Sequence, residues 1–179
     1  MFQGSGRLSS EGRRELALLV AAATVLGVVD SMVPRPLPFL RLGLANIPAI
    51  IVIIRSGFLK ALELNFARVT AVALVTGTIA TPAFLLSASG AAASTIVMAG
   101  VHSVFQGKVS LPAVSASGAV ASLWAQLFIA GALLSELPSE SLVPVLSLWG
   151  TVSGAITGMA AAGIMRKLPE LEALRMNLP

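Results

Sequence analysis

The chain has 179 residues, of which 56% are hydrophobic and only 11% charged, and its mean hydropathy is +0.90. Soluble domains do not reach such values, so the composition predicts an all-α integral membrane protein. The lack of cysteine excludes disulfides, thiolate metal sites and cysteine nucleophiles, and the single histidine, His102, cannot form a histidine metal cluster. We therefore expect neither a metal site nor a cofactor.

The formal charge of +4 and the pI near 10.7 would also suit a nucleic-acid partner. The basic residues, however, stand singly at the ends of apolar runs, with no aromatic residues between them, unlike a nucleic-acid-binding surface. We interpret them as signals of membrane topology. The expected surroundings are a lipid bilayer, and no nucleic acid is expected as a partner.

Three regions follow one another along the chain. The first six residues, MFQGSG, resemble the remnant of a cleaved expression tag, and we leave residues 1–6 out of the fold. We expect no signal peptide, because the apolar run from Glu15 onward lacks a small-residue cleavage site. Residues 7–167 are predicted to form a transmembrane domain, and residues 168–179 a short cytoplasmic tail with a short cytoplasmic or interfacial helix.

Six apolar runs have, or approach, the roughly 20 residues that cross a hydrocarbon core of about 30 Å. They are, approximately, residues 15–33, 42–56, 59–80, 82–105, 110–134 and 142–165. The second run is short, and Pro34, Pro36 and Pro38 exclude a regular helix before it. That proline-rich segment must be buried in protein or line a cavity, because lipid cannot satisfy free backbone groups. Between the third and fourth runs, TGTIATPAF predicts a tight hairpin with Pro82 near its turn.

The Lys and Arg residues at the ends of these runs predict the topology. Nine fall on one side: Arg7, Arg13, Arg14, Arg55, Lys60, Lys108, Arg166, Lys167 and Arg175. Only Arg35 and Arg41 fall on the other side, where the loop SELPSES carries two glutamates and no base. By the positive-inside rule we predict six transmembrane helices with both termini cytoplasmic. The expected location is a bacterial cytoplasmic (inner) membrane.

Small residues recur at four-residue spacing in several runs, as in SGAITGMAAAG of the sixth run and in Ala17 and Ala21 of the first. In lipid, such stripes let helices approach closely. Packing inside the bundle is the simplest interpretation of any one stripe. For Ala17 and Ala21 the alternative is a contact with a partner protein.

A charge within the hydrocarbon costs a few kcal/mol, and the candidates for such buried charges are Asp30, Glu63 and Arg68. Asp30 is expected near the outer end of the first helix, and Arg68 about a third of the way along the third from its cytoplasmic end. Either the two form a pair, with a bent arginine that spans about 10 Å of depth at 1.5 Å per residue, or each has another partner. Glu63 is interpreted as structural, because Lys60 lies within one turn.

Polar residues in the outer half predict a pocket. The stretch FLRLGLANIP places Arg41 and Asn46 where the second helix begins, so Arg41 and nearby backbone N–H groups predict an anion site. The alternative is that Arg41 reaches the outer interface and Asn46 caps or bonds a neighbouring helix. In the fifth run, Trp124 and Gln126 offer an aromatic surface beside an amide, which is typical of a small-molecule pocket. The candidate substrate-binding residues are Asp30, Arg41, Asn46, Arg68, Trp124 and Gln126.

Four segments resemble successive motifs of the Gx transporter family, labelled heptaprenyl diphosphate synthase component I: RLGLANIPAI, NFARVTAVALVTG, PAFLLSASGAAASTIVM and VSASGAVASLWAQL. The resemblance covers about residues 15–165, and LGLAN is its most specific block. That family resembles the substrate-binding S-components of energy-coupling factor (ECF) vitamin transporters, which implies a six-helix, S-component-like bundle. Where the family's histidine–asparagine pair is expected, this chain has Ser122 and Leu123 and keeps only Gln126.

The resemblance also implies a partner. S-components are similar in using an alanine-x-x-x-alanine face on their first helix to dock on a transmembrane coupling subunit, which works with ATPases. Ala17 and Ala21 occupy matching positions.

An enzyme is not predicted, because prenyl transfer needs magnesium held by clustered aspartates and Asp30 is the only aspartate. The chain also has no P-loop with which to energise transport. The predicted function is a substrate-binding subunit for uptake of a small vitamin or cofactor precursor. A self-sufficient carrier and a non-catalytic scaffold of an isoprenoid, quinone or flavin pathway complex are the alternatives.

Overall fold

A computed structural model describes residues 10–32, 43–44, 46–134 and 142–176. In these residues the chain forms six helices: α1 (Ser10–Met32), α2 (Asn46–Ser56), α3 (Phe58–Thr76), α4 (Pro82–Val104), α5 (Leu111–Leu134) and α6 (Leu142–Met176). Each predicted apolar run corresponds to one helix, and the described ranges contain no strand. The all-α prediction is therefore confirmed.

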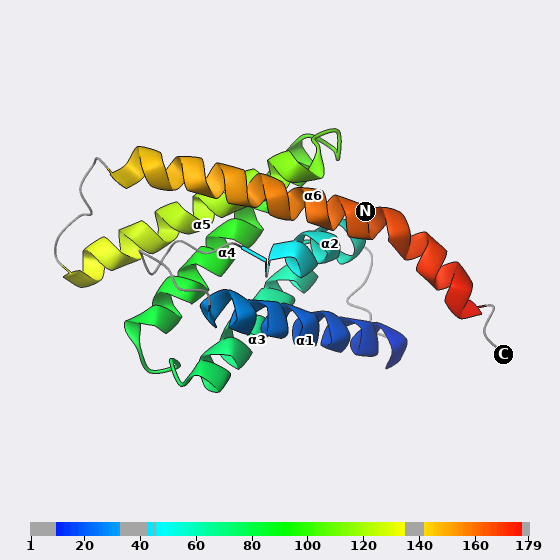
Figure 1. Ribbon diagram of the computed structural model, residues 1–179, viewed down its shortest axis with the longest axis horizontal. Helices are drawn as coiled ribbons and strands as arrows, with labels where there is room; N and C mark the ends of the chain where they lie inside the picture. The colour runs from blue at the N-terminus through cyan, green and yellow to red at the C-terminus, as the bar shows by residue number, and fades with distance from the viewer. Residues whose placement is uncertain (1–9, 33–42, 45, 135–141, 177–179) are drawn as a thin grey trace.

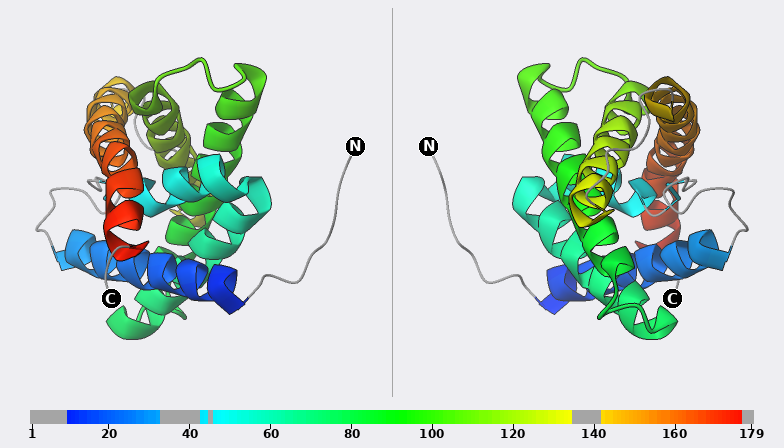
Figure 2. Two further views of the ribbon diagram at one scale, coloured as in Figure 1. Left: turned by 90° about the vertical axis from the view of Figure 1, so that its right-hand side faces the viewer. Right: turned by 90° about the vertical axis from the view of Figure 1, so that its left-hand side faces the viewer.

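Helices α4, α5 and α6 pack side by side in chain order, and the α4–α5 and α5–α6 contacts are the most extensive in the bundle. Helix α1 packs mainly on α3, so that α1 and α6 lie on opposite sides of the molecule (Figure 1). The short α2 lies in the middle, between α1 and α6, and contacts every other helix (Figure 2).

Glycines let α5 and α6 approach each other closely. Gly150, Gly154 and Gly158 recur every four residues on the face of α6 that meets α5. A Cβ added at Gly154 would lie 2.6 Å from the Cα of Ala116, and one at Gly158 would lie 2.5 Å from the Cα of Pro112. Backbone atoms cannot move aside, so a side chain at either position would force the helices apart. Bundle packing is thus confirmed for the small residues of the sixth run.

The connections between helices follow from their turn residues. Gly77 ends α3 in the left-handed conformation (φ 69°), and the N–H of Thr78 bonds the carbonyl of Ala73 at 2.8 Å, a pattern that satisfies the free carbonyls of a helix end. Pro82 then occupies the first position of α4, where its missing N–H costs nothing. The predicted tight hairpin is confirmed. Gly57, with φ 83°, joins α2 to α3 as a single residue.

The apolar core surrounds α2. All seven residues from Ile47 to Ile53 are buried, so this helix is enclosed on every side. They pack with buried side chains of the other five helices: Ala23, Ala61, Leu64, Met98, Val114 and Ala161. We call this set the apolar cluster.

In the part of the chain that the structure describes, three helices are long and apolar enough to cross a membrane: Pro82–Val104, Leu111–Leu133 and Val143–Lys167. The chain is therefore a membrane protein. Helix α2, with 11 residues, is about 17 Å long at 1.5 Å per residue and cannot cross a core of about 30 Å by itself. The apolar part of α1, Ala17–Ser31, is also short. Six spans remain a prediction.

Helix α6 continues as one element to Met176, so most of the predicted separate tail is an extension of this helix.

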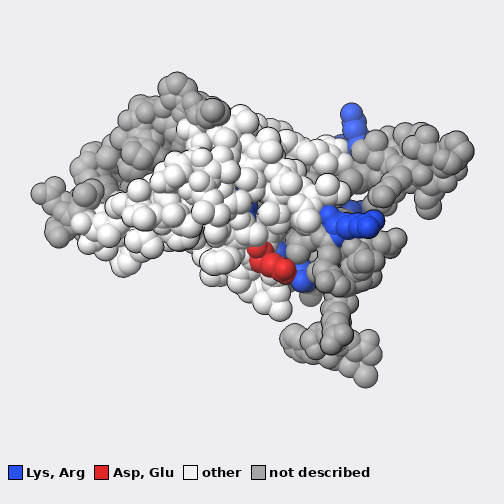
Figure 3. All heavy atoms as spheres, turned by 90° about the horizontal axis from the view of Figure 1, so that it is seen from below, with Lys and Arg blue, Asp and Glu red and all other residues white. Residues whose placement is uncertain are grey.

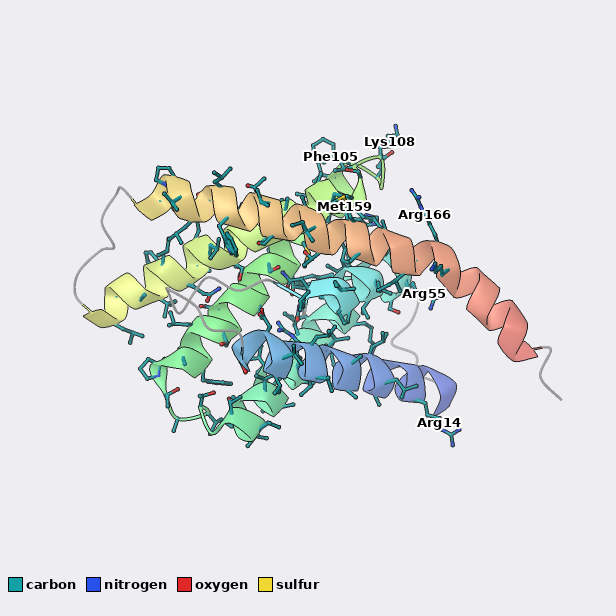
Figure 4. The ribbon with its side chains drawn as sticks, viewed as in Figure 1. Arg14, Arg55, Phe105, Lys108, Met159 and Arg166 are labelled. Atoms are coloured by element: carbon teal, nitrogen blue, oxygen red, sulfur yellow. The ribbon has the colours of Figure 1, made fainter. Side chains whose placement is uncertain are left out.

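Basic residues gather at one end of the bundle. Arg14, Arg55, Lys108 and Arg166 all project at the end where α1 begins and α6 leaves the bundle (Figure 4). The space-filling view shows the same asymmetry, with most of the face uncharged and the basic atoms mainly toward one end (Figure 3). We call this the basic end.

Candidate ligand-binding site

A cavity of about 370 Å³ lies between the helices, and all six helices contribute to its wall. Its polar wall residues are Asp30, Ser31, Asn46, Arg68, Thr76, Thr78, Ser87, Ser122, Gln126 and Ser153. The volume falls in the lower part of the range of about 300 to 1,000 Å³ that small-molecule pockets occupy. Apolar walls with a few converging polar groups are also typical of such pockets.

The cavity and the apolar cluster occupy different stretches of each helix. On α3, Ala61 and Leu64 belong to the apolar cluster, whereas wall residues lie between 68 and 76. On α4, Met98 belongs to the cluster, whereas wall residues lie between 83 and 91. Helices α1, α5 and α6 divide in the same way. The apolar cluster therefore separates the cavity from the basic end.

A chain of buried hydrogen bonds fixes Arg68 in the wall. Its Nε donates to Oδ1 of Asn65 at 3.0 Å, and Nδ2 of Asn65 donates to Oγ1 of Thr95 at 2.6 Å. The Thr95 hydroxyl donates in turn to the carbonyl of Ala91 at 2.7 Å. Asn65 and Thr95 are 1% and 0% exposed, so the chain is shielded from water. It ties α3 to α4 and sets the plane of the guanidinium group.

Asp30 from α1 lines the same cavity as Arg68 from α3. Both side chains are buried, at 4% and 8% exposure. Helix α1 packs directly on α3, and both residues reach the cavity from these two helices. The structure thus brings the two buried opposite charges to one cavity, while a direct pair between them remains a prediction.

Gln126 is held against the backbone of α4. Its Nε2 donates to the carbonyl and the hydroxyl of Ser122 at 3.2 and 3.0 Å. A Cβ added at Gly90 would lie 2.7 Å from both Nε2 of Gln126 and Oγ of Ser122. Glycine at position 90 is therefore what makes room for these two polar wall residues.

Asn46 is the first residue of α2 and lines the cavity, so the predicted start of the second helix is confirmed. Gly43 turns the chain before it with φ 74°. The N–H of Asn46 bonds the carbonyl of Gly43 at 2.8 Å, and the N–H of Ile47 bonds that of Leu44 at 3.1 Å. Pro48 has no N–H. The first three positions of α2 therefore offer no free N–H group to the predicted anion site.

Two other predicted site residues are not in the described wall. Arg41 lies outside the described residues, so its contribution stays a prediction. Trp124 is half exposed, at 50%, and is not among the wall residues, because it lies on another face of α5 from Gln126. The aromatic side chain in the wall is Phe84 of α4, which the sequence analysis missed. Two residues apart on a helix means about 200° of rotation, which separates Trp124 from Gln126.

The other residues discussed in the sequence analysis lie outside the cavity. Glu63 forms an ion pair with Lys60 at 2.7 Å, one turn apart on α3, as its structural interpretation predicted. Ala17 and Ala21 are exposed on α1, on the same face as Leu18, which is 71% exposed. No three of the described His, Asp and Glu residues are placed to hold a metal ion.

The model of one protein family, described as heptaprenyl diphosphate synthase component I, matches residues 19–164. The chain belongs to this family. The matched range contains every wall residue of the cavity, and it confirms the family resemblance that the sequence motifs indicated. The family's description names one component of a synthase, which implies a second component. No curated protein and no solved structure matches the chain.

Proposed function

We propose that this member of the family is a membrane-embedded substrate-binding subunit for uptake of a small vitamin or cofactor precursor, resembling an ECF S-component and without an ATPase of its own. The observation that carries the proposal is the cavity of about 370 Å³, into which all six helices bring polar side chains. Burying polar groups costs free energy unless they gain partners. Four of the ten polar wall residues are buried, namely Asp30, Arg68, Gln126 and Ser153, and a cavity that gathers them from four different helices supports a ligand-binding role.

The direction of uptake follows from the basic residues. If the basic end faces the cytoplasm, as the positive-inside rule requires, the cavity lies in the outer half of the membrane and receives its ligand from outside. Six spans with cytoplasmic termini, in the inner membrane of a bacterium, satisfy this orientation. The segment of residues 33–42 would then cover the outer mouth, with Arg41 as an additional ligand contact.

The need for a partner follows from the apolar cluster. Because the cluster lies between the cavity and the basic end, apolar side chains separate a molecule bound in the cavity from the cytoplasmic side in this arrangement of helices. Release on that side requires the bundle to move, and because the chain has no P-loop, we propose that the energy for this movement comes from another subunit. The exposed Ala17 and Ala21 offer a flat surface on α1 for an ECF-type coupling subunit with its ATPases.

Native mass spectrometry of the detergent-solubilised protein tests the proposal. We expect a co-purified small molecule that is released on unfolding, and a rise in melting temperature when that molecule is added back, because a ligand that binds only the folded state stabilises it. A protein that carries no small molecule and gains no stability from extracts of its own cells would contradict the proposal.

A second candidate function has one observation in its favour, the family's description as a synthase component. In this alternative the chain is a non-catalytic membrane scaffold of an isoprenoid, quinone or flavin pathway complex. A scaffold binds protein and leaves the cavity without a ligand, so the same mass spectra distinguish the two functions.

A further inference from the structure

We infer that the molecule bound in the cavity carries a planar ring with a cyclic amide edge, an N–H group beside a C=O group, and that Gln126, Ser122 and Asn46 bind this edge. The inference rests on the proposed function, since it names the chemical class of the substrate that the cavity takes up.

The two charged residues of the described wall, Asp30 and Arg68, are engaged within the protein. Both have interaction partners in the chain. Arg68, for example, donates from Nε to Oδ1 of Asn65 at 3.0 Å. Because these charges already have partners, the neutral polar residues of the wall are the better guide to the chemistry of the ligand.

Most hydroxyl groups of the wall use their proton within their own helix. Four donate to a backbone carbonyl three or four residues earlier: Ser31 to Val28, Thr76 to Val72, Ser87 to Ala83 and Ser153 to Gly150. Such local bonds leave oxygen lone pairs but no proton for a ligand. The two carboxamides of the wall, Asn46 and Gln126, keep more bonding capacity.

The bonds of Gln126 determine which end of its amide is left for a ligand. The carbonyl of Ser122 can only accept, so the atom that faces it at 3.2 Å must be the donor Nε2. Nε2 also donates to the hydroxyl of Ser122 at 3.0 Å, so its two N–H groups have two acceptors. Oε1 remains as an acceptor for a ligand N–H. The Ser122 hydroxyl accepts from Gln126 and keeps its own proton for a ligand C=O.

Asn46 supplies a second amide from α2. Its side chain lines the cavity, and it forms no hydrogen bond with any residue that the structure describes. An amide with both its donor and its acceptor available can bind two adjacent groups of one molecule, as Asn and Gln do at the edge of a nucleobase. Arg41, which the proposed function places at the same ligand, has only donors and therefore also suits a ring carbonyl.

The rest of the wall suits the faces of a flat ring. Val69 and Val72 of α3 and Phe84 of α4 line the cavity with apolar surface. The volume of about 370 Å³ leaves room for one or two rings. A polyol of that size would press hydroxyl groups against these apolar side chains, where they find no partners and cost free energy.

Three kinds of probe test the inference on the full-length protein in detergent. The first are uracil and its benzo-fused analogue benzoyleneurea, cyclic imides of one and two rings. The second are their N,N′-dimethyl derivatives, which keep the ring and both carbonyls but have no N–H. The third is myo-inositol, a polyol without a planar ring. Apparent affinities are obtained from the rise of melting temperature with probe concentration.

We expect the better imide to bind about tenfold or more tightly than its dimethyl derivative and than inositol, because the derivative cannot donate to Oε1 of Gln126. Gln126→Leu removes this acceptor and should abolish the preference of the imide over its dimethyl derivative. Trp124→Leu changes a half-exposed residue of the same helix outside the wall and should leave the preference unchanged. If Gln126→Leu fails to fold, the ranking of the probes on the unaltered protein decides the inference.

Equal affinity for the imides and their dimethyl derivatives, or tightest binding of inositol, would overturn the inference and leave the proposed function standing. A preference that persists in Gln126→Leu would also overturn it, because the preference would then reflect the bulk of the methyl groups. Absence of binding by every probe would overturn it as well. In that case, the small molecule sought by native mass spectrometry decides separately whether the cavity is a binding site.

Discussion

Gly90→Ala is the sharpest structural test of the cavity. Gly90 faces Gln126 and Ser122, and a Cβ there would lie 2.7 Å from a polar atom of each. Both atoms are at the ends of side chains, so they can move, but only by leaving their present hydrogen bonds. Gly100 lies on the same helix with nothing within 4 Å of an added Cβ, and Gly100→Ala is therefore the matched control.

The expected difference in stability between the two variants follows from the helix propensity that each gains and the hydrogen bonds that each loses. Both exchange a helical glycine for alanine, which favours the helix by about 1 kcal/mol, and this contribution cancels in the comparison. Gly90→Ala also breaks the two bonds from Gln126 to Ser122, each with a net contribution of about 1 kcal/mol. We therefore expect Gly90→Ala to be less stable than Gly100→Ala by about 2 kcal/mol.

The assay measures melting temperature and ligand retention on both variants in the same detergent. The expected order of melting temperatures is Gly100→Ala, then the unaltered protein, then Gly90→Ala. Retention of the co-purified molecule should fall about fivefold in Gly90→Ala, because one polar contact from Gln126 is displaced. Equal melting temperatures and equal retention in the two variants would refute the close packing of Gly90 against this part of the wall.

Three further predictions concern topology, partner and ligand. A cysteine at Ser139 should react with an impermeant reagent added outside and one at Lys108 should not, on a background free of native cysteine; the reverse pattern would overturn the orientation. Leucine at both Ala17 and Ala21 should leave the isolated protein folded but abolish its association with a coupling subunit, whereas loss of folding would assign the two alanines to internal packing. Arg41→Ala should weaken ligand binding by about 1.5 to 3 kcal/mol with little change in stability without ligand, and Arg41→Lys should also bind less well, because a point charge does not replace a bidentate fork. Unchanged affinity would make Arg41 an interfacial anchor.

Much of the fold can be predicted from local signals in the chain. Each helix corresponds to a long apolar run, so the number and approximate ends of the helices could be predicted from the sequence. The hairpin between Gly77 and Pro82 could also be predicted, as could the start of α2 near the stretch FLRLGLANIP. The asymmetry of basic residues is also a property of sequence alone, and the structure shows four of them at one end. Family membership follows from the motifs themselves. These features depend on neighbouring residues and on the apolar environment of the membrane.

Which residues line the cavity could be established only from the tertiary structure. Gln126 faces the cavity, whereas Trp124 on the same helix faces outward. The sequence did not predict this difference, because a helix that is apolar all round has no hydrophobic periodicity to show which face is buried. The approach of α1 to α3 brings Asp30 and Arg68 to one cavity although they lie 38 positions apart in the chain. Sequence alone determined which groups are too polar for lipid; only the packing of the six helices decided which of them share a cavity, because that depends on contacts between residues far apart in the chain.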